Sequence, residues 1–238
     1  KESLLFLHGY LADKRTFYHQ LKFFEKFYPC YAFDMSGFGT SPEPSYPYDL
    51  SDYRDEVFLY IDKNGLKNVS VIAHSFGARV AVKCELFKPT FNKLVLTGAA
   101  GLKPKFNLKT FVKKTYYKAI KNFLSEEKKL NFFSEDYKNS SPLMRQSLIK
   151  IVNETFDKSL TVFKPETLFI FGENDTATPV YMGKRYLKKT PAGKLVIMKN
   201  AGHFAFIDRP DAFNEEVFAF LTDSAASRCG YKNRIKII

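Results

Sequence analysis

Residues 69–77 have the sequence VSVIAHSFG, and this stretch decides the fold. Its first five residues, Val69 to Ala73, form a short apolar run that predicts a strand buried on both faces of a parallel sheet. Ser75 follows after one intervening residue, His74, and a helical pattern then continues to about Phe87. Small residues stand two positions before and after the serine, as a sharp, strained turn from a strand into a helix requires. The stretch therefore predicts that the Ser75 hydroxyl is exposed at the end of a strand.

Further short apolar runs lie on both sides of this stretch. They alternate with segments in which apolar residues recur at helical spacing, which predicts parallel crossovers and a doubly wound, mostly parallel α/β sheet. The predicted strands are 3–7, 31–34, 69–73, 93–97, 167–171 and 194–198; the predicted helices are 13–27, 50–64, one that ends near 87, one that begins near 179, and 211–221. Ser51 is predicted as the N-cap of the helix over 50–64.

The stretch 102–163 interrupts this alternation. It contains Lys-rich amphipathic helical segments without a strand pattern, and it falls between two strands of the same sheet. We therefore predict a helical cap insertion over the carboxyl ends of the strands, where open α/β sheets bind ligands. The expected division of the chain is a core of 1–101 and 164–222, a cap of 102–163, and a tail of 223–238 without a clear pattern.

The composition excludes some classes of protein. Apolar residues make up 45% of the 238 residues, which is enough for a sizeable core. There is no run of about 20 apolar residues that could span a membrane, and no secretory pattern opens the chain. The three cysteines, Cys30, Cys84 and Cys229, match no metal-binding spacing, so we expect reduced thiols in a cytoplasmic protein.

The chain is basic, with a formal net charge of +12. Between Leu102 and Lys164, 13 Lys and one Arg oppose six acidic residues, so +8 of this charge lies there. Such an excess can attract nucleic acid, anionic membranes or acidic substrates. No nucleic-acid-binding motif accompanies it. We therefore interpret the lysines as a solvated helical face and expect no nucleic-acid partner.

A serine hydroxyl becomes an effective nucleophile only when a base removes its proton. Of the four histidines, His203 follows the last predicted strand within the sequence NAGHF. That position predicts a place at the carboxyl edge of the sheet, near Ser75. His8 precedes Gly9, and His74 lies in the turn next to Ser75, so both are expected to have structural roles. His19 is expected on a solvent-facing side of a helix.

The base needs a carboxylate that fixes its tautomer and stabilises its charged form. Asp175 ends the sequence FGEND after the preceding strand, and the order Ser75, Asp175, His203 is the one expected for this fold. Glu173 is the nearest alternative acid. Asp34 also ends a strand, but it precedes the nucleophile in the chain, and we expect it to stabilise the glycine-rich loop that follows it.

An oxyanion needs hydrogen-bond donors. The backbone N–H of Phe76 lies at a predicted helix N-terminus, where it can stabilise a developing negative charge. After the first strand, Gly9 permits a tight turn that would direct the N–H of Tyr10 toward Ser75, or the N–H of Leu11 if the turn lies one residue later. The loss of one such donor costs about 3 kcal/mol of transition-state stabilisation.

With these motifs the sequence resembles the α/β-hydrolase superfamily over about residues 3–221. The resemblance rests on LHGY at 7–10, DMSGFGTS at 34–41, AHSFG at 73–77, GEND at 172–175 and GH at 202–203. It implies a catalytic triad of Ser75, His203 and Asp175, an oxyanion hole formed by the N–H groups of Tyr10 and Phe76, and a helical cap. The mechanism needs no metal and no organic cofactor.

Two departures from the family pattern matter. Members usually begin with a hairpin before the strand that precedes His-Gly, whereas this sequence starts at Lys1, almost directly with that strand, consistent with a trimmed start. The dehalogenases and epoxide hydrolases of the superfamily carry Asp at the position of Ser75, so those activities are not expected here.

The predicted reaction is acyl transfer to water from a small carboxylic ester. Three rival activities would use the same triad: hydrolysis of a carbon–carbon bond, thioester hydrolysis, and proline-iminopeptidase-like peptide hydrolysis. The last needs acidic groups that hold a substrate amine, and the insertion is basic. A ligand-sensing module and association with nucleic acid or membranes through the lysines are the non-catalytic alternatives.

Overall fold

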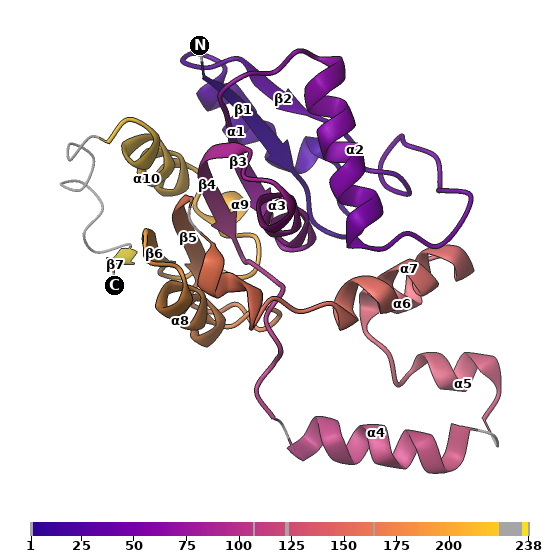
Figure 1. Cartoon of the computed structure of the whole chain (residues 1–238). Helices are drawn as coiled ribbons and strands as arrows, with labels where there is room; N and C mark the ends of the chain where they lie inside the picture. Colours follow the sequence, from indigo (N-terminus) through magenta and orange to yellow (C-terminus); the bar gives the residue numbers. More distant parts are fainter. Residues whose placement is uncertain (1, 107, 122–123, 164, 224–234, 238) are drawn as a thin grey trace.

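The computed structural model describes residues 2–106, 108–121, 124–163, 165–223 and 235–237. Within these residues seven strands form one sheet, in the order β2-β1-β3-β4-β5-β6-β7 (Figure 1). The first six strands in this order pair in parallel, and β7 pairs antiparallel with β6. The prediction of a mostly parallel α/β sheet is confirmed.

The elements follow one another along the chain as the alternating pattern predicts. The strands are β1 (Ser3–Leu7), β2 (Cys30–Ala32), β3 (Val69–His74), β4 (Phe91–Thr97), β5 (Glu166–Gly172), β6 (Gly193–Met198) and β7 (Ile235–Ile237). The helices are η1 (Lys14–Phe17), α1 (Tyr18–Phe24), α2 (Leu50–Lys63), α3 (Phe76–Phe87), α4 (Leu108–Ile120), α5 (Glu126–Leu130), α6 (Glu135–Lys138), α7 (Pro142–Asn153), η3 (Ser159–Val162), α8 (Val180–Lys189), α9 (Ala205–Asp208) and α10 (Pro210–Leu221).

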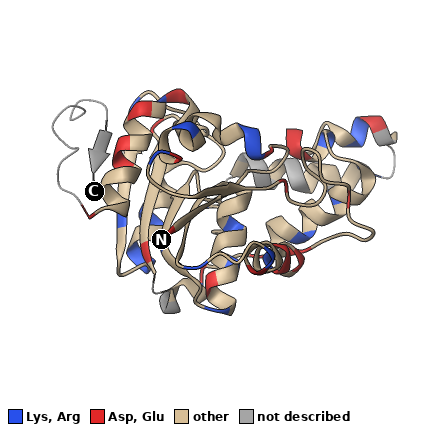
Figure 2. Cartoon of the chain, turned by 90° about the horizontal axis from the view of Figure 1, so that it is seen from above, with Lys and Arg blue, Asp and Glu red and all other residues tan. Residues whose placement is uncertain are grey.

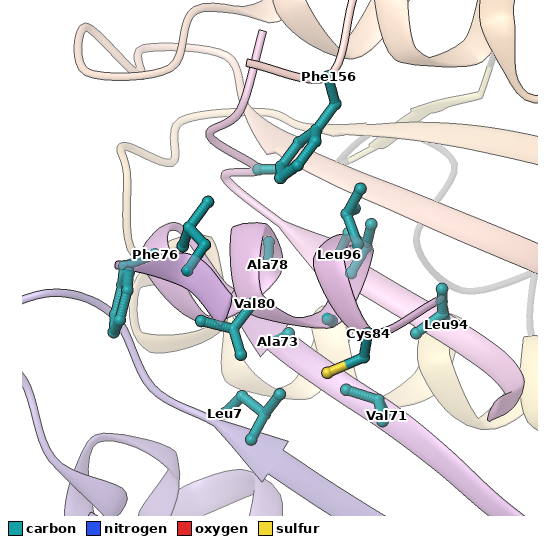
Figure 3. Close-up of a cluster of buried hydrophobic side chains, with 14 of the residues drawn as sticks. Leu7, Val71, Ala73, Phe76, Ala78, Val80, Cys84, Leu94, Leu96 and Phe156 are labelled. Carbon is teal, nitrogen blue, oxygen red and sulfur yellow. The ribbon is translucent and has the colours of Figure 1, made fainter. Parts of the chain in front are cut away.

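Helices cover both faces of the sheet, so the central strands are buried on both sides. Successive side chains of a strand point to opposite faces. Leu5 and Leu7 of β1 therefore belong to the apolar cluster under α2, α3 and α8, whereas Leu4 and Phe6 belong to the cluster under α1 and α10. Figure 3 shows the first cluster, in which side chains of α3 lie over those of β1, β3 and β4. This packing fixes the position of α3 against the strand ends.

Several details differ from the sequence-based expectations. The helix predicted over 13–27 is the 3-10 helix η1 followed by α1, which ends at Phe24, the strand predicted over 31–34 is β2, which ends at Ala32, and the short helix α9 was not predicted. The N-cap of α2 is Asp49 and not Ser51, because Asp49 accepts the backbone N–H of Asp52 and the Asp52 side chain accepts the N–H of Asp49 in return. The strand β7 lies in the tail for which no pattern was predicted.

Cys30 and Cys84 are free thiols, and Cys229 lies outside the described residues.

The helices α4 to α7 and the turn η3 lie between β4 and β5, where the insertion was predicted. In Figure 1 they extend away from the sheet, and α4 is the most distant of them. No helix in the described part of the chain combines the length and the apolar character needed to cross a membrane. The exact limits of the insertion, 102 and 163, and its role as a cap stay predictions.

Candidate active site

Ser75 occupies the turn between β3 and α3. Its backbone has φ 50° and ψ −103°, a combination that is strained for a residue with a Cβ atom. Gly77 explains how the turn can be so tight. A Cβ at position 77 would come within 2.3 Å of the carbonyl oxygen of Leu7 and 2.6 Å of that of His8. The helix α3 therefore begins directly against the end of β1, and the strained turn predicted from the small residues is present.

The loop after β1 approaches this turn closely. A Cβ on Gly9 would lie 2.8 Å from the ring of His74, so only glycine fits without a shift. The ring of Tyr10 packs edge-on against that of Phe76, with centroids 5.8 Å apart, and the Tyr10 hydroxyl donates to the carbonyl of Met144 at 2.9 Å. Within the described residues, the backbone N–H groups of Tyr10 and Phe76 have no hydrogen-bond acceptor.

Leu11, the alternative oxyanion donor, has a different environment. Its backbone has a positive φ of 54°, and its side chain is 46% exposed. Tyr10 and Phe76 line the pocket at Ser75, whereas Leu11 is not among the residues that line it. Of the two candidate donors, Tyr10 therefore lies at the pocket and Leu11 does not.

His203 and Asp175 meet at the carboxyl ends of β5 and β6. The Nδ1 atom of His203 lies 2.8 Å from Oδ2 of Asp175, whose side chain is completely buried. Gly98, after β4, makes room for the imidazole, because a Cβ there would lie 3.1 Å from the ring. Glu173, the alternative acid, instead accepts the backbone N–H of Asn200. The structure thus joins the predicted base to Asp175 and not to Glu173.

Thr178 completes the surroundings of the carboxylate and was missed in the sequence analysis. Its hydroxyl donates to Oδ2 of Asp175 at 2.7 Å, and the N–H groups of Ala177 and Thr178 donate to Oδ1, both at 2.8 Å. Burial alone would raise the pKa of Asp175, but the hydrogen bonds from His203 and Thr178 outweigh it and lower the pKa below its usual value. Asp175 therefore stays ionised at neutral pH.

Three residues that were expected to be structural, His74, His8 and Asp34, are held by hydrogen bonds near the strand ends. His74 is buried, with Nδ1 3.2 Å from the carbonyl oxygen of Thr97 and its ring centroid 4.6 Å from that of His203. Burial, and next the nearby His203, lower the pKa of His74 to about 3, so its ring is neutral. His8 accepts the N–H of Met35. Asp34 accepts the N–H groups of Lys14 and Thr40, which confirms its expected role in the glycine-rich loop.

One pocket, with a cavity volume of about 340 Å³, contains Tyr10, Ser75, Phe76 and His203, while Asp175 lies behind His203. Most of the wall is apolar. The residues that form it beside the predicted ones are Gly9, His74, Arg79, Ala100, Asp136, Leu148, Ile151, Val152, Ala177, Thr178 and Phe204. Four of these come from α6 and α7, so the segment between β4 and β5 contributes directly to the pocket.

Arg79 connects α3 with α7 and was not predicted. It lies one turn after Ser75, is buried, and donates through Nη1 to the carbonyl oxygens of Ile151 at 3.0 Å and Glu154 at 2.8 Å. These are carbonyl groups at the C-terminal end of α7, where a helix lacks internal donors. No local sequence pattern marks such a contact, because it depends on how the inserted helices pack.

Asp136 brings a negative charge to the same pocket. It belongs to α6, and burial raises the pKa of its carboxyl group above the usual value; His203 opposes this shift, and the charge of Glu135 adds to it. The pocket therefore contains an acidic group although the surrounding segment is basic. The net charge of a segment does not show which of its side chains enter the pocket.

Comparison with known proteins agrees with this architecture. The model of the "Alpha/beta hydrolase family" matches residues 4–216. The chain is 26% identical to a protein of Mycoplasma pneumoniae named putative esterase/lipase 2, over 93% of this chain and 89% of that protein. An esterase from Exiguobacterium antarcticum has a similar structure, with a TM-score of 0.75 and 21% identity over 93% of this chain and 92% of that chain.

A second solved structure of the same fold is the meta-cleavage product hydrolase from Pseudomonas fluorescens IP01. Its TM-score is 0.73, with 20% identity over 94% of this chain and 91% of that chain. At such identities the two structures share the fold with this chain, and nothing about the substrate follows from them. The match of the family model extends across both sides of the insertion and over every residue that lines the pocket.

Proposed function

This chain belongs to the alpha/beta hydrolase family, and from that premise we propose that it is a serine hydrolase that cleaves small carboxylic esters. One observation carries the proposal: His203 Nδ1 lies 2.8 Å from the buried carboxylate of Asp175, in a pocket that also contains Ser75. A base that is oriented by a carboxylate next to a serine is the arrangement that activates a hydroxyl group.

In the proposed reaction, Ser75 Oγ attacks the ester carbonyl carbon. His203 accepts the hydroxyl proton on Nε2, because Nδ1 is directed to Asp175. The proton then passes to the departing alkoxide, which leaves as an alcohol. A water molecule next attacks the acyl-enzyme with His203 again as the base, and the carboxylic acid and free Ser75 are released.

The oxyanion hole is proposed to consist of two backbone donors. The N–H groups of Tyr10 and Phe76 border the pocket and lack an acceptor in the part of the chain that is described. Donors held by the backbone need no reorganisation when the negative charge develops on the carbonyl oxygen. Gly9 and Gly77 support this arrangement, because both permit the close approach of the β1 loop to the start of α3.

We further propose that residues 102–163 act as a cap that shapes the acyl-binding part of the pocket, with 1–101 and 164–222 as the catalytic core. Leu148, Ile151 and Val152 of α7 supply an apolar wall. Such a wall suits a hydrocarbon acyl chain, because burial of each CH₂ group stabilises binding by about 0.8 kcal/mol. A carboxylic ester with an apolar acyl group is therefore the substrate class that this pocket favours.

The proposal is tested with p-nitrophenyl esters of increasing acyl length. We expect turnover by the parent protein and a loss of about 10³-fold or more in Ser75→Ala. Ser51→Ala is the matched control, since Ser51 lies on α2 and outside the pocket. Equal hydrolysis by the parent and Ser75→Ala would refute the role of Ser75. If no ester is hydrolysed, a fluorophosphonate that labels Ser75 would separate a selective enzyme from a binding module.

Asp136 favours a second candidate, the release of an N-terminal residue from a peptide. A carboxylate in the pocket could bind the amine of such a substrate by a charge-assisted hydrogen bond. Asp136→Asn would then increase the KM for an amino-acid p-nitroanilide and leave p-nitrophenyl ester hydrolysis unchanged. If the parent protein hydrolyses esters and no amino-acid anilide, this candidate is excluded.

A further inference from the structure

Helix α4 carries a row of apolar side chains that the described part of the chain leaves largely exposed, although the ring of Tyr116 also lies 6.2 Å from that of Phe132. Leu108, Val112 and Tyr116 are spaced by four residues and therefore lie on one face of the helix. Their side chains are 64%, 56% and 58% exposed. Figure 1 shows α4 at the lower edge of the molecule, away from the sheet. Exposed apolar patches of this kind often mark sites of interaction.

The same segment is the most basic part of the chain. From residue 103 to residue 121 the sequence contains seven lysines and no acidic residue: Lys103, Lys105, Lys109, Lys113, Lys114, Lys118 and Lys121. They account for +7 of the formal net charge of +12. Asp and Glu occur over much of the rest of the molecule (Figure 2), although α7 and α8 carry two and four basic residues and no acidic one. A solvated face would explain the lysines but not the exposed apolar row beside them.

We propose that α4, with the lysine-rich residues that flank it, binds the surface of a bilayer that contains anionic lipids. A helix of this type lies in the plane of the interface, with its apolar side chains at the boundary between headgroups and acyl chains. Basic residues add electrostatic attraction to anionic headgroups. Leu108, Val112 and Tyr116 would supply the apolar contact, and the lysines would supply the charge.

Two other partners fit these observations less well. Nucleic acid would be held by the lysines, and the exposed ring of Tyr116 could stack on a base, but the aliphatic Leu108 and Val112 offer no ring and would stay uncovered. A second copy of the chain could cover the apolar row, but it would bring two segments of seven lysines each together and produce strong repulsion. An anionic bilayer matches both the apolar row and the charge. The proposal does not depend on the proposed ester hydrolysis.

The test is co-sedimentation of the full chain with vesicles. We expect binding to vesicles of phosphatidylcholine with phosphatidylglycerol, little binding to phosphatidylcholine alone, and weaker binding as the salt concentration rises. Binding that is absent, or equal for both lipid compositions, would overturn the proposal. Binding to single-stranded DNA in place of the vesicles would overturn it as well and indicate a nucleic-acid surface.

Two sets of variants separate the apolar and charged contributions. The triple variant Leu108→Ser, Val112→Ser and Tyr116→Ser is expected to lose binding by more than tenfold, whereas Leu59→Ser, at a position of α2 that is 67% exposed, is expected to bind like the parent. Each lysine-to-glutamine change within 103–121 is expected to weaken binding about fivefold. Lys63→Gln, on α2, is the matched control for these lysine-to-glutamine variants.

All of these positions lie outside the pocket, so circular dichroism can confirm that the variants are folded, and ester hydrolysis can be measured separately. Loss of vesicle binding in the triple variant, with the fold retained, is the result that supports the proposal. Undiminished vesicle binding by the folded triple variant would overturn it.

Discussion

The strained backbone at Ser75 predicts that the chain becomes more stable when this residue is replaced by glycine. The comparison should be made between Ser75→Gly and Ser75→Ala. Both variants lack the hydroxyl group, so they differ chiefly in whether position 75 carries a Cβ atom. With φ 50° and ψ −103°, a Cβ at this position costs about 1–3 kcal/mol, and glycine relieves that cost.

Glycine also increases the conformational entropy of the unfolded chain, which destabilises the folded state by about 0.5–1 kcal/mol relative to alanine. The net expectation is that Ser75→Gly exceeds Ser75→Ala in free energy of unfolding by about 1 kcal/mol. For a chain of this length that difference corresponds to about 2–4 °C in Tm. Thermal and urea unfolding measure it directly.

Both variants are expected to be inactive towards p-nitrophenyl esters, so a gain in stability in Ser75→Gly would accompany a complete loss of function. Equal or lower stability of Ser75→Gly would refute the reasoning, because it would mean that the turn is not strained. Glycine placed at a relaxed position should give the opposite sign. Leu59, on the exposed face of α2, is a suitable position, and Leu59→Gly should be less stable than Leu59→Ala by about 1 kcal/mol.

Two further predictions concern the surroundings of Ser75. Gly77→Ala would place a Cβ 2.3 Å from the Leu7 carbonyl oxygen, so α3 must shift by about 1 Å, and kcat/KM is expected to fall about 10²-fold. Gly65 has open space around it but a φ of 59°, so Gly65→Ala should lower stability and leave ester turnover unchanged. Burial opposes ionisation of Asp34, but its hydrogen bonds lower its pKa from 3.8 to about 2. Because this pKa is lower in the folded than in the unfolded chain, the carboxylate stabilises the fold above pH 4, and this stabilisation disappears as the pH falls towards 2. Urea unfolding should therefore show Asp34→Asn less stable than the parent by about 2 kcal/mol at pH 7, with no difference near pH 2.

The parts of the site that could be predicted from the sequence are those that follow from strand ends. Ser75, Asp175 and His203 each follow a recognisable apolar strand, and the carboxyl ends of parallel strands meet at one edge of the sheet. The strained turn at Ser75 and the contact between Asp175 and His203 could therefore be expected from local patterns and chain order. That these residues carry out catalysis is still a prediction.

The parts that could not be predicted depend on packing between distant segments. Thr178 hydrogen-bonds to Asp175 through the particular path of the loop after β5, and Arg79 and Asp136 enter the pocket only because of the way α6 and α7 pack. The N-cap of α2 shows the same limit on a smaller scale. Asp49 and Ser51 are both suitable cap residues, and the reciprocal bond with Asp52 decides between them.

The bonds from Arg79 to the end of α7 have a consequence for redesign of the protein. They tie α7 to the same helix that begins at Ser75, so any change in the position of α7 is transmitted to the turn that holds the serine. Lys83 adds an ion pair with Glu154 at the same end of α7. In an exchange of segments between relatives, α7 should therefore be transplanted together with α3 or left in place.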